Sequence, residues 1–243
     1  MQKLMPNGRV WFHIQDKQTP HVGVFDMKKY IDAHCHLFDE KLPNNIGAIV
    51  NSTRPSEWRN VIAMADKNPN VFMAIGVHPW FVGDLVAGWD AQMCEFLEQN
   101  PGLTIGEIGL DKYKPDMDTQ MNVFARQMDL AVKLGRGVHV HCVGAWDKMF
   151  AVLKKYKSQQ PPFILFHRFS GNAMDVTRLV ADYNAYFSFS GARRIIADVQ
   201  RDRILVETDS NNPTGIVRVA EQIAAICPDC DFYENTMEML KNG

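Results

Sequence analysis

Ile31-Asp32-Ala33-His34-Cys35-His36 is a short apolar run that ends in two histidines one residue apart. Side chains two residues apart on a β-strand point to the same face. A strand that ends here therefore directs the imidazoles of His34 and His36 to one place. Imidazole is a common ligand of transition metals, so two of them side by side predict a metal site at the end of this strand.

Similar short apolar runs recur along the chain from Tyr30 onward, and stretches with helical spacing separate them. In 118–134, for example, Met121, Phe124 and Met128 recur at the spacing of one helix face. The predicted strands are 30–33, 48–51, 72–76, 103–106, 137–141, 163–166, 185–189 and 204–207. The predicted helices are 56–67, 91–99, 118–134, 145–157, 173–183, 193–198, 214–226 and 232–240.

Strands that alternate with helices predict a parallel sheet with right-handed crossovers. Eight such units fit an α/β fold of the (β/α)₈ barrel type, which typically needs about 250 residues. The alternative is an open doubly wound sheet, but its dinucleotide-binding form has no support because no G-x-G-x-x-G follows an early strand. We expect one barrel domain over 29–243, preceded by an N-terminal extension, 1–28, in which 10–14 and 21–25 resemble the strands of a hairpin.

Composition limits the setting in which the protein works. The 243 residues carry a net charge of −2, so no global positive field attracts nucleic acid or a membrane surface. No apolar run is long enough to span a bilayer, and the N-terminus lacks the apolar core of a signal peptide, so we expect a cytoplasmic protein. The five scattered cysteines predict no disulfide framework, and we interpret Cys227 and Cys230 as structural rather than as a redox pair or half a zinc site.

Good metal ligands follow the predicted strands at several further places. In a barrel the carboxyl ends of all strands meet at one mouth, where barrel enzymes build their active sites. Four imidazoles and two carboxylates exceed the needs of one tetrahedral zinc ion, and they suit two divalent ions that share a bridging carboxylate. The six predicted ligands are His34, His36, Glu107, His141, His167 and Asp209.

Three other residues lie near these strand ends. His78 follows the third strand, so it either faces the mouth or belongs to a loop. His139 and Glu207 each precede a predicted ligand by two residues, and they should lie one layer deeper in the barrel. We expect Glu207 to orient a ligand histidine and His139 to pack or support the site.

The blocks around these residues resemble the TatD family of metal-dependent deoxyribonucleases, which belongs to the amidohydrolase-like barrels. The order and spacing of six blocks carry the resemblance, which runs from about Tyr30 to the C-terminus. The blocks are Ile31-Asp32-Ala33-His34-Cys35-His36-Leu37, Gly76-Val77-His78-Pro79, Gly106-Glu107-Ile108-Gly109-Leu110-Asp111, Val140-His141, His167-Arg168-Phe169-Ser170-Gly171 and Glu207-Thr208-Asp209-Ser210.

The resemblance implies a distorted (β/α)₈ barrel with up to two or three divalent ions. His34, His36 and Asp209 would hold one ion, and Glu107 would bridge to a second ion on His141 and His167. His78 and Arg168 would lie near a substrate phosphate. The chain departs from the family pattern at Val143, where arginine is usual, at Arg168, where cysteine is common, and after Asp209, where Ser210-Asn211 replaces Ala-Pro.

These observations predict a metal-dependent hydrolase that acts on ester bonds, with DNA as substrate. Two divalent ions, Zn²⁺, Mn²⁺ or Mg²⁺, would activate a water, and Asp209, together with Glu107, would carry the catalysis. One alternative is an amidohydrolase acting on a small amide, lactone or phosphoester, and another is a metal-stabilised interaction module without catalysis. Nothing in the sequence indicates a membrane or a protein partner.

A nuclease needs basic or aromatic residues around its mouth, and the candidates are Arg54, Trp80, Phe81, Lys112, Tyr113, Arg168, Arg193 and Arg194.

Overall fold

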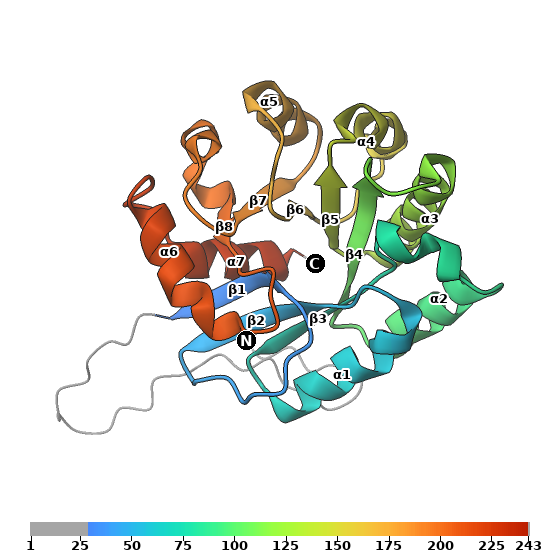
Figure 1. The fold of residues 1–243 in the computed structure, drawn as a ribbon, viewed down its shortest axis with the longest axis horizontal. Helices are drawn as coiled ribbons and strands as arrows, with labels where there is room; N and C mark the ends of the chain where they lie inside the picture. Colours follow the sequence, from blue (N-terminus) through green and yellow to red (C-terminus); the bar gives the residue numbers. More distant parts are fainter. Residues whose placement is uncertain (1–28, 243) are drawn as a thin grey trace.

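Each of the eight apolar runs forms a β-strand in the computed structural model, which describes residues 29–242. All neighbouring strands pair in parallel, and their order in the sheet is their order in the sequence. The sheet curls into a nearly closed (β/α)₈ barrel, as predicted (Figure 1). The strands are β1 (Tyr30–Cys35), β2 (Ile46–Asn51), β3 (Val71–Ile75), β4 (Leu103–Asp111), β5 (Val138–Val143), β6 (Ile164–Phe166), β7 (Ala185–Phe189) and β8 (Ile204–Val206).

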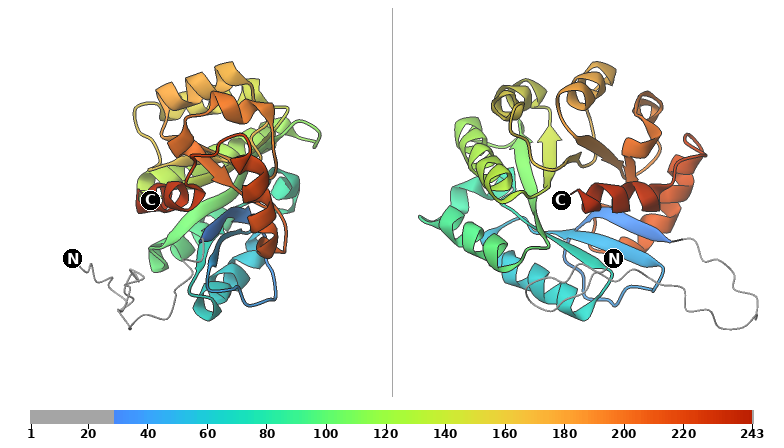
Figure 2. Two further views of the ribbon diagram at one scale, coloured as in Figure 1. Left: turned by 90° about the vertical axis from the view of Figure 1, so that its left-hand side faces the viewer. Right: turned by 180° about the vertical axis from the view of Figure 1, so that it is seen from behind.

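Helices surround the barrel on its outer side (Figures 1 and 2). Their ends follow ordinary capping chemistry: Asp116 accepts a hydrogen bond from the backbone of Thr119 where α3 begins, and Gly135 ends that helix at a φ of 63°. The α-helices are α1 (Trp58–Lys67), α2 (Trp89–Gln99), α3 (Met117–Leu134), α4 (Trp146–Leu153), α5 (Ala173–Asp182), α6 (Ile216–Ala224) and α7 (Phe232–Lys241). Short 3₁₀ helices are η1 (Pro55–Glu57), η2 (Pro79–Asp84), η3 (Lys154–Tyr156), η4 (Arg194–Asp198), η5 (Arg201–Arg203) and η6 (Pro213–Gly215).

Two apolar clusters stabilise this arrangement. The larger one joins the strands to the surrounding helices and includes Trp58 of α1 and Phe124 of α3, both fully buried. The smaller cluster joins residues of several strands, such as Ile31 and Leu205, to Met239 of α7. Helix α7 crosses beside β1 and β8, as the view from behind shows (Figure 2). Apolar side chains thus fill one end of the barrel, while the polar site lies at the carboxyl ends of the strands.

The seam between β8 and β1 is closed without a regular ladder in the described part of the chain. Just beyond β8, the Asp209 amide donates to the His34 carbonyl at 3.0 Å, and the His36 amide donates to the Ser210 carbonyl at 2.9 Å. The buried Asp32 carboxylate completes the seam by accepting hydrogen bonds from the backbone and hydroxyl of Thr208. These bonds bring the first and last predicted ligands of the chain into contact.

Three features differ from the sequence-based prediction or go beyond it. Strand β4 does not end before Glu107 but continues to Asp111, with a register shift against β5 between Ile105 and Ile108. The predicted helix 193–198 is a 3₁₀ helix, η4. A disulfide joins Cys227 and Cys230 in the turn between α6 and α7, a bond that the sequence pattern does not predict.

Two further expectations concern the ends of the chain and membranes. The predicted hairpin at 10–14 and 21–25 lies outside the described residues, and the boundary at 28/29 stays a prediction. Among residues 29–242, no helix has both the length and the apolar character that crossing a bilayer requires.

Candidate metal centre

The Glu107 carboxylate is buried at the mouth of the barrel and divides its two oxygens between two groups of histidines. Its Oε2 lies 3.4 Å from Nε2 of His34 and 3.7 Å from Nε2 of His36. Its Oε1 faces a second group, which consists of Nε2 of His167 at 2.7 Å, Nδ1 of His141 at 2.9 Å and Nε2 of His78 at 3.1 Å. The carboxylate therefore has the position of a bridge between two sets of nitrogen donors.

Asp209 divides its oxygens in a similar way. Its Oδ1 lies 3.2 Å from Nε2 of His36 and 3.9 Å from Nε2 of His34, while its Oδ2 accepts a hydrogen bond from Nη1 of Arg168 at 2.7 Å. Asp209 and Arg168 both have positive φ, 50° and 42°, which is uncommon for residues with a side chain. Such a strained backbone persists only where the surrounding contacts hold it in place, and it is often found at functional sites.

Irregular backbone places these side chains. The register shift of β1 falls between Asp32 and Cys35, at His34, and that of β4 falls at Glu107. A shift of this kind redirects a side chain relative to the regular alternation of the strand. Two glycines make room at β4: a Cβ on Gly106 would lie 2.5 Å from Oδ1 of Asn51, and one on Gly109, at a φ of 144°, would collide with the His141 carbonyl.

All six predicted ligands lie together at the mouth, and His78 lies among them rather than in an outlying loop. Three groups bring three ligand atoms within 4.8 Å of one another: His34, His167 and Asp209; His34, His36 and Glu107; and His78, Glu107 and His141. His34 and His167 also stack, with ring centroids 3.9 Å apart. The atoms predicted to bind the two ions therefore lie close together around Glu107.

Residues behind the ligands orient them. Glu207 lies 3.7 Å from Nδ1 of His167 and accepts the Arg168 amide at 2.8 Å, the supporting position that the strand pattern predicts. His139 is buried one layer deeper, where its Nε2 lies 3.2 Å from the hydroxyl of Thr104. Glu207 thus lies beside a predicted ligand, whereas the His139 ring lies 6.4 Å from that of His34, measured between ring centroids.

The sequence-based prediction missed three supporting residues. Asp32 accepts the His34 amide at 3.2 Å, Asn51 offers its carbonyl to Nδ1 of His36 at 3.3 Å, and Asp111 lies 3.7 Å from Nε2 of His141. The bond to Asn51 leaves Nε2 of His36 directed at the carboxylates. Asp32 shares a strand face with His34, and Asn51 ends β2, so the rules of strand periodicity and strand ends could have found both.

Electrostatic coupling sets the charge of the cluster. Burial raises the pKa of Glu107, but the charges of His167 and His78 and its hydrogen bonds lower it more, and it lies well below its usual range. Burial lowers the pKa of His167, but the Glu107 carboxylate raises it well above its usual range. The pKa of His34 is lowered by burial and by His167. Glu107 is therefore an anion that holds a proton on the adjacent His167.

The donor set fits divalent metal ions. Nε2 of His34, which lies 3.4 Å from Oε2 of Glu107, is a buried ring nitrogen without a hydrogen-bond partner in the described structure. Unpaired buried polar atoms are costly, and coordination to a cation would satisfy ring nitrogens that face the cluster. Nδ1 of His141 and Nε2 of His167 are 3.1 Å apart, and both lie within 3 Å of Oε1 of Glu107. Mixed nitrogen and carboxylate donors suit zinc, manganese or iron.

Several predicted rim residues lie close to this cluster. The indole ring of Trp80 lies 5.3 Å from the His78 ring, and the Phe81 ring lies 6.2 Å from it. The guanidinium carbon of Arg54 stands 3.7 Å from the centre of the Phe81 ring. Arg193 donates to the Phe169 carbonyl, next to Arg168, at 3.2 Å. The mouth therefore carries aromatic and cationic side chains beside the predicted ligands.

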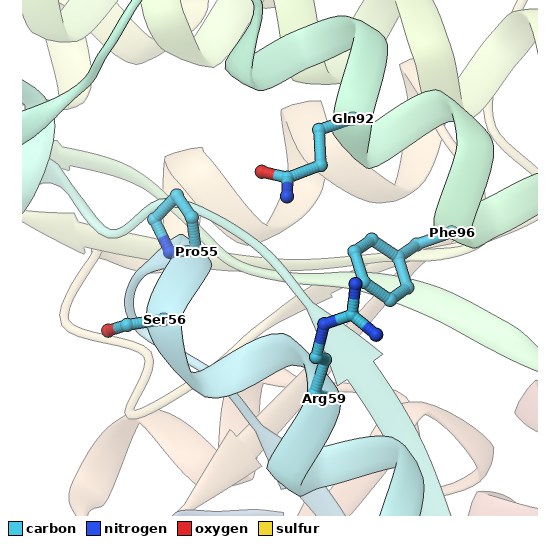
Figure 3. Close-up of a pocket in the computed structure, with 5 residues that line it drawn as sticks. All are labelled: Pro55, Ser56, Arg59, Gln92 and Phe96. Atoms are coloured by element: carbon cyan, nitrogen blue, oxygen red, sulfur yellow. The ribbon is translucent and has the colours of Figure 1, made fainter.

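A separate pocket of about 320 Å³ lies between α1 and α2 (Figure 3). Pro55, Ser56, Arg59, Gln92 and Phe96 line it, with Arg59 directed toward the Phe96 ring. None of these residues belongs to the cluster around Glu107. The pocket contains no carboxylate, histidine or cysteine, so it lacks the groups that the predicted chemistry needs.

A parallel barrel whose mouth combines histidines with a central carboxylate defines the class of metal-dependent hydrolases. The sequence model of one family, described as TatD related DNase, matches residues 31–228, and the chain belongs to this TatD family.

Individual relatives agree with this assignment. The chain is 25% identical over 231 residues to the metal-dependent hydrolase YabD of Bacillus subtilis, an alignment that covers 80% of this chain and 90% of the relative. It is 23% identical over 212 residues to the 3'-5' ssDNA/RNA exonuclease TatD of Erwinia tasmaniensis, covering 75% of this chain and 81% of the relative. The crystal structure of the TatD homologue YjjV of Escherichia coli has the same fold, with a TM-score of 0.71 and 24% identity over 88% of this chain and 95% of that chain.

Proposed function

We propose that this protein is a nuclease that hydrolyses phosphodiester bonds of DNA at a centre of two divalent ions. The observation that supports this most directly is the position of Glu107, whose two oxygens face two separate groups of histidines at 2.7–3.7 Å. A bridging carboxylate is what a two-metal hydrolytic site requires. The Erwinia relative, named as a 3'-5' ssDNA/RNA exonuclease, supports nucleic acid as the substrate class.

His34, His36 and Asp209 would hold one ion, and His141 and His167 would hold the second, with Glu107 between them. When bound, the ions supply a water of lowered pKa and positive charge for the phosphoryl oxygens. His78 lies against Oε1 of Glu107 and within 4.8 Å of a His141 ligand atom, so it can serve the second ion or a substrate phosphate.

Asp209 is the proposed general base. Burial raises the pKa of Asp209, but the hydrogen bond from His36 and the charges of His34 and His167 lower it by more. The carboxylate is therefore ionised at neutral pH. It accepts the proton of the attacking water as the new phosphorus–oxygen bond forms and the ester bond breaks, and the departing ester oxygen takes a proton from solvent. The Arg168 guanidinium, already at Oδ2, turns that oxygen away from the histidines and presents positive charge at the mouth, where the scissile phosphate must enter.

An assay on end-labelled single-stranded DNA, double-stranded DNA and single-stranded RNA tests the proposal. We expect cleavage with Mn²⁺, Zn²⁺ or Mg²⁺, loss of cleavage with a chelator, and recovery when metal is added back. Asp209→Asn should lower turnover on the order of 100-fold, the lower range for loss of a general base. Asp39→Asn, at an exposed loop position, is the matched control and should behave as wild type.

Two results would contradict the proposal. Wild-type rates in Asp209→Asn, in a variant that unfolds at the wild-type urea concentration, would reject the role of this carboxylate. Absence of cleavage with every divalent metal would reject nucleic acid as substrate and would favour the alternative of a small amide, lactone or phosphoester.

A further inference from the structure

Trp80 is a large aromatic residue that stays exposed beside the candidate metal centre. It belongs to η2, two residues after His78, and 52% of its surface is accessible. Its ring meets the His78 ring edge to face at 5.3 Å, and His78 in turn lies 3.1 Å from Glu107. The exposed indole is therefore one side chain away from the place where the reaction is proposed to occur.

The indole is held in place although it faces solvent. Its Nε1 donates to Oδ2 of Asp111 at 2.7 Å, and Asp111 is buried and also accepts the Tyr113 amide at 2.8 Å. The Trp80 backbone amide donates to Nδ1 of His78 at 3.1 Å. Because its polar atom is already satisfied, the ring offers an arriving molecule an apolar aromatic surface. A ring that is already fixed loses little conformational freedom on binding.

Positive charge accompanies this aromatic surface. The Lys114 ammonium lies 3.9 Å from the centre of the Trp80 ring, and Arg54 lies over the ring of Phe81, the next residue. The chain as a whole has a net charge of −2, so these cations form a local feature of the mouth. A half-exposed aromatic ring with an ammonium over it is complementary to a flat aromatic group that is joined to an anion, which describes a nucleotide: the base can stack on the ring while the lysine side chain turns to the phosphate.

We propose that Trp80 is a base-stacking platform that determines substrate specificity: a nucleobase next to the scissile phosphate stacks on the indole, and Lys114 lies beside the backbone phosphate. This inference rests on the proposed nuclease function and specifies its substrate as a strand with an unpaired base. A base inside a duplex has both faces covered by its neighbours, so only unpaired bases can use the platform. Stacking tolerates every base, so the platform selects unpaired strands without selecting sequence.

The test compares two substrates of equal length and charge, a single-stranded oligonucleotide and a fully abasic oligonucleotide. For the wild type we expect kcat/KM to be about 5- to 150-fold higher on the intact strand, as stacking of one base predicts. Trp80→Leu should lower this ratio to about 2 or less while leaving the rate on the abasic strand within about twofold, because every predicted metal ligand is kept. Trp80→Phe keeps an aromatic ring but loses the donor to Asp111, so it should keep most of the ratio.

The control variant is Ile226→Ala, which changes an exposed apolar residue in the turn after α6 and should leave the ratio at its wild-type value. The inference is overturned if Trp80→Leu keeps the wild-type ratio. It is also overturned if the variant lowers both rates equally, because Trp80 would then act by positioning Asp111.

Failure of the nuclease proposal has a different signature, the absence of cleavage of either strand by the wild type. In that case the two strands are compared by fluorescence anisotropy with a chelator present. Tighter binding of the intact strand that disappears in Trp80→Leu supports the platform, and equal binding of the two strands overturns it.

Discussion

Asp32 offers a sharp test of how the barrel seam supports the metal centre. Its carboxylate is fully buried and accepts hydrogen bonds from the His34 amide, the Thr208 amide and the Thr208 hydroxyl. Asp32→Ala leaves the two amides without a partner inside the protein. A buried donor left unsatisfied costs about 1–3 kcal/mol, so the two together should cost about 2–6 kcal/mol. This loss is a large share of the ~5–15 kcal/mol by which a typical protein is stable.

Asp32→Asn separates the lost hydrogen bonds from the lost charge. Burial raises the pKa of Asp32 well above its usual range, with partial compensation by the bonds from Thr208, so the site disfavours the charge that asparagine lacks. The amide oxygen can still accept from both backbone amides. The Thr208 hydroxyl can reverse its role and accept from the new amide group. We therefore expect Asp32→Asn to cost about 1 kcal/mol, the value of one ordinary hydrogen bond.

Urea unfolding of chelator-treated protein measures these differences. With a slope of about 3 kcal/mol per molar urea, the alanine variant should unfold about 0.7–2 M earlier than wild type. Asp39→Ala, at an exposed loop position, is the control and should unfold with the wild type. A midpoint of Asp32→Ala within 0.2 M of wild type, roughly 0.6 kcal/mol on the same slope, would refute the reasoning. Equal losses in the alanine and asparagine variants would show that charge, rather than the paired amides, is what matters.

Further predictions concern the metal, pH and Arg168. Metal added to about 100 times its dissociation constant should stabilise the protein by about 2.7 kcal/mol, and Glu107→Gln should lose most of this gain in a thermal melt. Without metal, the raised pKa of His167 contributes stability that is present below about pH 6.5 and is lost as the pH rises through the raised pKa. The lowered pKa of Glu107 contributes stability that is lost as the pH falls through the lowered pKa. Urea midpoints in chelator should therefore fall toward both extremes. Both declines should be weaker in Glu107→Gln, because glutamine does not titrate and does not raise the pKa of His167. Arg168→Ala should raise KM for oligonucleotides and weaken the salt dependence of KM, yet change the stability by under about 1 kcal/mol, because the guanidinium is 59% exposed.

The barrel and the ligands of the centre were predictable because they depend on local rules. Alternating strand and helix patterns indicate parallel crossovers, and the carboxyl ends of parallel strands meet at one mouth. His34, His141 and Asp209 are far apart in sequence, but these rules alone bring them together. Their roles as ligands stay a prediction that metal binding must test.

The remaining features depend on contacts between strands, which no local pattern contains. The continuation of β4 past Glu107 follows from its pairing with β5, where Gly109 and Asp111 lie opposite His141 and Val143. A local pattern ends the strand at Gly106, because the charged side chain of Glu107 interrupts the apolar run. The seam at Asp32 depends on a partner 176 positions away, Thr208, so strand periodicity places Asp32 on the face of His34 but does not reveal this partner.

Cations at the mouth would allow a chain of net charge −2 to receive the proposed polyanionic substrate. Lys114 and Arg54 lie over aromatic rings on the side of the mouth near His78, and Arg168 lies on Asp209 on the other side of Glu107. The ligand cluster between them combines two ionised carboxylates with a protonated His167, so without bound cations it offers a phosphate no net positive charge. Substrate affinity should therefore depend on metal at the centre and on these three side chains at the rim. A charge reversal at Arg54 should weaken binding of an oligonucleotide with or without metal, whereas a chelator should weaken binding even when all three cations remain.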